Sequence, residues 1–189
     1  MRCLALSLIL VIAIGGPAQV APLGVQDWQR ADVATVRLKP AAFADLSAQI
    51  RQALERRGCT VPQSYGRPKP HNIIRGHFTS ANQMDVAVLC SRARVSSILV
   101  FRGGSSTDVA ELASSPDAGF LQGLGPGVIG YSRSLAAADP KYIQDHYVRY
   151  GGPKPPPLDH DGIDDGFDGK ASVVRYWYRG RWLQLQGAD

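Results

Sequence analysis

Four aspartates within seven residues form the cluster in this sequence best suited to chemistry. They are Asp159, Asp161, Asp164 and Asp165, and Gly162 between them permits a tight turn. Calcium takes about six to eight oxygen ligands, so the run predicts a calcium site, although its glycine and its lack of a final glutamate depart from the EF-hand pattern. The alternative is an acidic turn whose side chains accept hydrogen bonds from backbone N–H groups ahead of a strand.

The same run offers groups for hydrolysis. His160 stands among the aspartates, and carboxylates with an imidazole are the usual general acids and bases. The chain has no Gly-x-Ser-x-Gly nucleophile motif and no acid, base and nucleophile at a recognisable spacing. The sequence therefore favours a non-catalytic protein, and the alternative is an envelope-directed hydrolase that uses the acidic loop 159–165.

A second cluster combines aromatic rings with arginine. Its members are Tyr176, Trp177, Tyr178, Trp182 and Arg179. Aromatic rings flanked by arginine suit both sugar stacking and protein hot spots. Because side chains alternate between the two faces of a strand, half of these residues must face the core. We expect the other half to bind an envelope protein or a polysaccharide.

The first 18 residues have the pattern of a secretory signal peptide. Arg2 gives a basic start, residues 3–14 are almost entirely apolar, and residues 16–18 supply small side chains for cleavage. Cleavage is predicted after residue 18, with Ala21 as the second choice. The apolar run is too short to cross a ~30 Å bilayer core as a helix. Residues 19–189 are then one periplasmic or secreted domain without a membrane span; the alternatives are an uncleaved anchor and a buried helix.

Cysteine usage agrees with export. Cys3 belongs to the predicted signal peptide, which leaves Cys59 and Cys90 as an even pair. In an oxidising compartment such a pair predicts a disulfide, and closing a loop of about 30 residues contributes about 3–4 kcal/mol in the chain-entropy model. The alternative is two separate buried thiols. No cofactor other than calcium is predicted.

Composition narrows the partners. The chain is 44% hydrophobic and 20% charged, enough apolar content for a folded core, and its formal net charge is +5. The basic residues are scattered and form no run of five or six, so no nucleic-acid partner is predicted.

Apolar periodicity predicts an α+β fold that is mainly antiparallel sheet, with two helices and one disulfide. Apolar residues at three- and four-residue steps predict helices over 41–57 and 139–150. Three β-branched runs predict an antiparallel meander, and an alternating aromatic run predicts a C-terminal hairpin. The predicted strands are 72–78, 84–90 and 96–101 in the meander, and 172–178 and 181–186 in the hairpin.

One strand-to-strand segment resembles a known repeat. Over residues 76–88 the chain resembles the FG-GAP or VCBS-type repeat of secreted β-propeller proteins, and residues 159–167 resemble it more weakly. The matching positions are Gly76, Phe78, Asp85, Ala87 and Val88. The acidic calcium ligands of the repeat are replaced by residues 79–82, so the resemblance implies a degenerate copy that has lost its metal. The chain also looks like small secreted bacterial proteins of unknown function.

Overall fold

The structure, a computed structural model, describes residues 23–187 and is mainly antiparallel β-sheet with helices, as predicted. The predicted signal peptide, residues 1–18, lies outside the described residues. The helices are α1 (Val25–Ala34), α2 (Ala48–Arg56) and α3 (Pro140–Tyr150), with 3₁₀ turns η1 (Pro40–Ala42), η2 (Arg102–Gly104) and η3 (Asp117–Phe120). The strands are β1 (Arg37–Leu38), β2 (Val61–Pro62), β3 (Ile73–Gly76), β4 (Asp85–Arg92), β5 (Val95–Phe101), β6 (Val109–Pro116), β7 (Leu121–Gly125), β8 (Val128–Tyr131), β9 (Arg133–Ala138), β10 (Gly162–Phe167), β11 (Ala171–Tyr178) and β12 (Arg181–Gln186).

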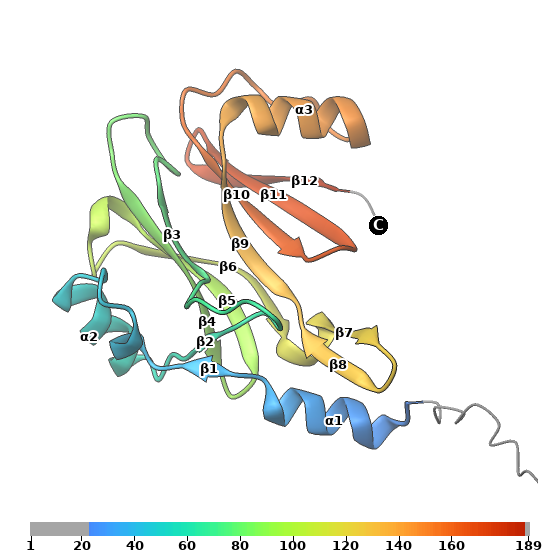
Figure 1. The fold of residues 1–189 in the computed structure, drawn as a ribbon. Helices are drawn as coiled ribbons and strands as arrows, with labels where there is room; N and C mark the ends of the chain where they lie inside the picture. Colours follow the sequence, from blue (N-terminus) through green and yellow to red (C-terminus); the bar gives the residue numbers. More distant parts are fainter. Residues whose placement is uncertain (1–22, 188–189) are drawn as a thin grey trace, which may run out of the picture.

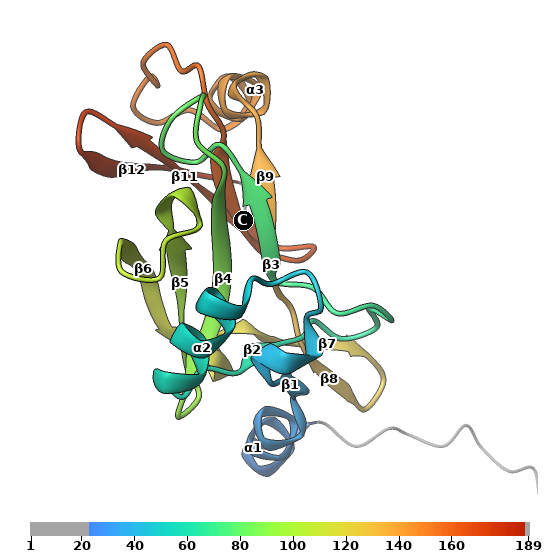
Figure 2. The same ribbon diagram turned by 90° about the vertical axis from the view of Figure 1, so that its left-hand side faces the viewer.

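Two four-stranded antiparallel sheets pack face to face. Their strand orders are β3-β4-β5-β6 and β12-β11-β10-β9, so each sheet is a meander. Helix α2 covers the outer face of the first sheet and α3 covers the outer face of the second, which gives four layers (Figure 1). The short pairs β1–β2 and β7–β8 lie at one end, where α1 packs against β8 (Figure 2).

Strand β4 shows why the first sheet is buried on both faces. Val86 and Val88 pack against α2, whereas Ala87 and Leu89 pack toward the second sheet. All four side chains are almost fully buried. Since successive side chains point to opposite faces of a strand, an apolar run without polar alternation belongs in the middle of a layered fold. The predicted meander and C-terminal hairpin are both confirmed by the pairing.

The prediction of two helices was wrong by one, and one predicted helix was too long. Helix α1 was missed because half of its residues are polar and none of them is fully buried. In place of a helix over 41–57, the chain forms the turn η1 and then α2. Ser47 accepts a hydrogen bond from Ile50 N through its side chain, so it caps α2 at a later start.

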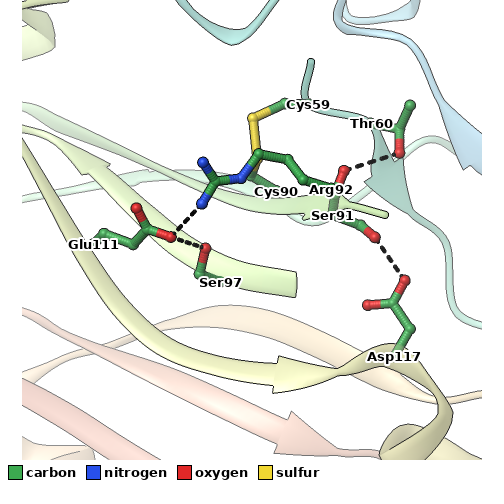
Figure 3. Close-up of a disulfide and its surroundings, with 8 residues drawn as sticks. All are labelled: Cys59, Thr60, Cys90, Ser91, Arg92, Ser97, Glu111 and Asp117. Carbon is green, nitrogen blue, oxygen red and sulfur yellow. Dashed lines mark hydrogen bonds and ion pairs between the residues drawn. A yellow bond between two sulfur atoms is a disulfide. The ribbon is translucent and has the colours of Figure 1, made fainter. Parts of the chain in front are cut away.

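The predicted disulfide between Cys59 and Cys90 is present and joins the segment after α2 to the second half of β4 (Figure 3). Beside it, Thr60 and Ser91 exchange backbone hydrogen bonds of 3.0 and 2.8 Å. Ser91 Oγ reaches the fully buried carboxylate of Asp117 at 2.6 Å. The covalent link therefore lies within a hydrogen-bonded region that ties the helical layer to β4 and η3.

Asp117 also forms an ion pair with an arginine from the first part of the domain. Arg37 on β1 lies 2.8 Å from Asp117 and 2.8 Å from Asp32 of α1. One arginine thus pairs with two carboxylates, and Arg94 reaches the second of them at 3.2 Å. These ion pairs hold α1 and β1 against the sandwich, together with Trp28 and Ala31 of α1, which pack partly buried against the core.

Candidate functional site

The two sheets enclose a cleft between β6 and the β11–β12 hairpin. Two cavities of about 300 and 390 Å³ lie there, and both are lined by Ala113 of β6 and Arg175 of β11. They are neighbouring cavities that meet at these two residues, and together we call them the inter-sheet cleft. Each is near the small end of the ~300–1,000 Å³ that ligand sites occupy.

A buried ion network forms the floor of the inter-sheet cleft. Asp165 of β10 accepts from Nε of Arg133 at 2.8 Å and from its Nη2 at 3.0 Å. On the other side, Nη2 of Arg175 lies 3.3 Å from Asp165 Oδ2. The side chain of Arg133 is 1% exposed and that of Asp165 is 5% exposed. Because one carboxylate serves two guanidinium groups, the network carries one net positive charge.

Arg133 uses all of its hydrogen-bond donors within this floor. Besides Asp165, its Nη1 donates to the backbone and hydroxyl oxygens of Ser96, and its Nη2 donates to the carbonyl of Ala113. These bonds use all five donors of the guanidinium. The ring of Phe120 lies 4.4 Å from its central carbon. Arg133 therefore joins the two sheets and has no donor left for a ligand.

The backbone of β6 is distorted at the cleft. Between β5 and β6 the pairing passes from Ser96–Ser115 to Ile98–Leu112, so β6 has one extra residue in this interval. Ala113 lies in the bulge with φ of +54°, which costs a residue with a side chain about 1 kcal/mol or more. The bulge turns the Ala113 carbonyl onto Arg133. Strain of this kind, held by a buried hydrogen bond, is typical of functional sites.

Aromatic rings line both parts of the cleft. Phe120 and Phe167, 5.6 Å apart and edge to face, line the part of about 300 Å³. Trp182 of β12 lines the other part, and its ring lies 5.7 Å from that of Trp177 on the neighbouring strand β11. Its indole Nε1 is buried without an acceptor among residues 23–187. The cleft thus has aromatic walls around a cationic floor.

The structure divides the predicted aromatic binding cluster between two faces of the second sheet. Tyr176 is 2% exposed and packs toward α3. Trp177 and Trp182 face the first sheet, where Arg102 stands 5.4 Å over the Trp177 ring. Arg179 is exposed in the β11–β12 turn and stacks on Tyr178 at 5.2 Å. That this cluster binds a partner stays a prediction.

The four predicted calcium ligands point to different partners. Asp161 Oδ2 accepts from His77 N at 2.9 Å, and Asp164 Oδ2 accepts from the Tyr142 hydroxyl at 2.9 Å. Within residues 23–187, no three acidic, histidine or cysteine side chains form a group that could hold a metal ion. Gly162 to Asp165 belong to β10 rather than to a loop. Calcium binding stays a prediction without a converging set of ligands in that range.

His160 is held between two acceptors. Its Nδ1 lies 2.7 Å from Asp159 Oδ1 and its Nε2 lies 3.0 Å from the carbonyl of Trp177. Both contacts are hydrogen bonds only when both ring nitrogens carry protons. The hydrogen bond from His160 is also the main reason that the pKa of Asp159 is lowered. Burial first, and then the neighbouring carboxylate of Asp164, raise the pKa of Tyr142 to about 12.

The two segments for which the sequence suggested a resemblance to the FG-GAP repeat lie side by side. His77 N donates to Asp161 Oδ2 at 2.9 Å, and Asp161 N donates to the carbonyl of His77 at 2.8 Å. In the first segment Asp85 is fully buried and accepts from Thr79, Gln83 and Gly103 N. Asp85 therefore shapes this connection through hydrogen bonds.

A separate groove of about 460 Å³ lies between α1, β8 and the connection around Tyr65. It is lined mainly by apolar atoms and has Arg67 and Lys69 among its lining residues. His71 stands beneath this connection, where its Nε2 accepts from Ser64 N at 2.8 Å. The groove has no buried ion network, so the inter-sheet cleft is the stronger candidate.

His71 is expected to make the protein less stable in acid. Burial is the largest cause of its lowered pKa, and Arg67 adds to it, whereas the carbonyl of Lys69 acts to raise it. In the folded protein Nε2 must stay unprotonated to accept from Ser64 N. The folded pKa lies below the unfolded value of about 6.5, so this contribution is complete above pH 6.5 and is lost as pH falls below it. We expect the thermal midpoint of the wild type to fall more between about pH 7.5 and 5 than that of His71→Gln. An equal fall would contradict this role.

The sequence did not reveal the cleft, because its charged floor is assembled from distant residues. Arg133 lies 32 positions before Asp165, and Arg175 lies 10 positions after it. One signal was visible: Arg175 interrupts the apolar side of a strand between Val173 and Trp177. An arginine on an inward-facing position needs a buried partner, and this rule could have paired it with a nearby aspartate.

Comparison of the chain with protein-family models, with curated proteins and with solved structures gave no match. Over residues 23–187, no helix is long and apolar enough to cross a membrane.

Proposed function

We propose that this protein is a non-catalytic domain that works outside the cytoplasm and captures an envelope ligand, either a protein segment or part of a polymer, in the inter-sheet cleft. The observation that carries the proposal is the cleft itself, which has aromatic walls and a positively charged floor. A buried ion network is costly to assemble, and aromatic and arginine side chains dominate binding sites.

Export is part of the same proposal. The disulfide is consistent with an oxidising compartment, and the sequence predicts a signal peptide in residues 1–18. With the segment 19–189 released, the domain would meet ligands of the periplasm or the exterior.

A relationship to the FG-GAP repeat, which occurs in secreted proteins, is consistent with the proposed export. In each four-stranded meander one of the two similar segments includes the last residues before the second strand and runs into that strand. The first segment runs from the end of β3 into β4, and the second covers residues 159–161 and the whole of β10. Equivalent placement in two sheets supports a common origin for the two segments.

Hydrolysis by the acidic loop 159–165 has less support. Asp165 is held by two arginines, and Asp164 accepts from Tyr142. Both ring nitrogens of His160 lie against protein oxygens, Nδ1 against Asp159 Oδ1 and Nε2 against the carbonyl of Trp177, so neither is directed at a water or a substrate. These contacts occupy the groups that an acid–base mechanism would use.

A substitution that fills the cleft with a bulky side chain, which we call the plug, tests the proposal. Ser114 is exposed on β6 and lines the cleft, so Ser114→Trp is expected to fill it without disturbing the core. Protein secreted from the full chain would be incubated with envelope extract, washed and denatured, and the released material identified by mass spectrometry. We expect material that the wild type retains to be lost from Ser114→Trp. The matched control is Gln52→Trp, exposed on α2 across the first sheet, which should retain it.

Two results would reject the proposal. One is an identical set of retained molecules for the wild type and Ser114→Trp, with circular dichroism showing that both are folded. The other is recovery of chemically cleaved molecules that accumulate with time in the presence of the wild type, because a binding domain leaves its ligand unchanged.

A further inference from the structure

The side chain of Arg175 differs from that of Arg133 in one respect that matters for binding. It makes three contacts: Nε and Nη2 with Asp165 Oδ2 at 3.4 and 3.3 Å, and Nη1 with Gln184 Oε1 at 2.8 Å. A guanidinium has five N–H donors. Two donors of Arg175, one on Nη1 and one on Nη2, therefore have no acceptor among residues 23–187.

These donors are available to the inter-sheet cleft. Arg175 lines both of its cavities and its side chain is 18% exposed, whereas Arg133 is sealed beneath. Asp165 and Gln184 fix the guanidinium from two sides, so little rotamer freedom remains to be lost on binding. Arg175 is thus a preorganised donor fork at the junction of the two cavities.

The charge and surroundings of the fork select a class of ligand. The network of two arginines and one aspartate has one net positive charge, which a single carboxylate balances. Two free N–H groups on adjacent nitrogens also match the two oxygens of a carboxylate. Beside Arg175 the cavity is lined by Phe120, Phe167 and Val173, which offer apolar contact.

We propose that Arg175 anchors a carboxylate in the inter-sheet cleft, and that the ligand is a monocarboxylate whose apolar body lies against Phe120 and Phe167. The inference rests on the proposed binding function and names the ligand class of that site. Polar side chains that line the cleft, such as Ser115 and Gln186, can form additional hydrogen bonds with the ligand.

Pairs of carboxylates and their neutral amides test whether binding depends on the negative charge of the ligand. The probes are phenylacetate and hexanoate, each paired with its neutral amide, titrated into ¹⁵N-labelled protein and followed by chemical shifts of cleft residues. We expect both carboxylates to bind at least tenfold more tightly than phenylacetamide and hexanamide. Arg175→Gln should weaken carboxylate binding at least tenfold, and Arg175→Lys should weaken it too, because a lysine keeps the charge but not the fork.

Arg56→Gln is the control, since Arg56 is exposed on α2 across the first sheet. Its carboxylate affinity should equal that of the wild type. Asp165 keeps Arg133 as a partner in the Arg175 variants, so we expect them to fold, as thermal unfolding would verify.

The outcomes separate this inference from the proposed function. Equal affinity for carboxylate and amide, or unchanged carboxylate affinity in a folded Arg175→Gln, would overturn the inference. If the carboxylates do not bind but envelope material is still lost from Ser114→Trp, the carboxylate assignment fails and the cleft remains a binding site. If the plug has no effect either, both proposals fail.

Discussion

Replacement of Asp165 by asparagine is expected to lower the free energy of unfolding by about 3–5 kcal/mol, because it leaves two guanidinium groups without a counter-charge. Arg133 is the more severe case, since its side chain is 1% exposed and cannot turn toward water. Asparagine has nearly the same shape as aspartate, so packing changes contribute little. Urea unfolding followed by circular dichroism would measure the loss.

Asp164→Asn is the matched control for this experiment. Asp164 is the preceding residue of β10, points to the opposite face and accepts a hydrogen bond from Tyr142. Its replacement removes a carboxylate from a partly exposed site, for which we expect a loss of about 1 kcal/mol. If Asp165→Asn were no more destabilising than Asp164→Asn, water would have to reach Arg133, and the floor of the cleft would not be the sealed network described above.

The rigid hydrogen bonds of the buried ion network explain how the cleft can stay open. Facing sheets of a sandwich normally close on their apolar side chains, as β4 and β5 do through Leu89 and Ile98. A rigid arginine–aspartate pair at the junction of β6 and β10 fills the interior with hydrogen bonds that fix the distance between the sheets. The bulge at Ala113 is needed for one of those bonds, so strain and charge act together to hold the site.

Local periodicity accounts for the part of the fold that could be predicted. The strands β4, β5, β11 and β12 are apolar or alternating over six to eight residues, and each pairs with its neighbour in sequence. Helix α1 was missed because its contact with the core is small: Trp28 and Ala31 pack there only partly buried, and Asp32 pairs with Arg37. Strand β6 was not predicted, because Ser114, Ser115 and the bulge interrupt the apolar pattern of the strand.

The candidate site could be predicted only in part, since its contacts are non-local. The acidic run drew attention to Asp165, but spacing alone suggested calcium, and the two positive charges came from strands β9 and β11 instead. In the aromatic run, alternation correctly implied that some rings are buried. It could not say which, because a shift of one residue exchanges the two faces of a strand.

Removal of the disulfide is the other change with a large expected effect. Cys59→Ala/Cys90→Ala should lose about 3–4 kcal/mol of unfolding free energy, because the cross-link spans 31 positions and restricts the unfolded chain. Both sulfurs also belong to the core that packs against α2, so the variant adds a small packing loss. Urea unfolding of the double variant and the oxidised wild type gives the difference.

Reduced wild type separates the cross-link from the packing. After unfolding with a phosphine reductant and refolding in its presence, both thiols occupy the same volume as before, and only the connection is missing. We expect this protein to unfold at a lower urea concentration than the oxidised form, with the alanine variant lower still. Equal stability of the oxidised and reduced wild type would mean that the hydrogen bonds around Ser91 and Asp117 hold α2 against β4 without the covalent bond. In that case the disulfide would not contribute to stability, and its support for an oxidising compartment would have to come from its formation in the native host.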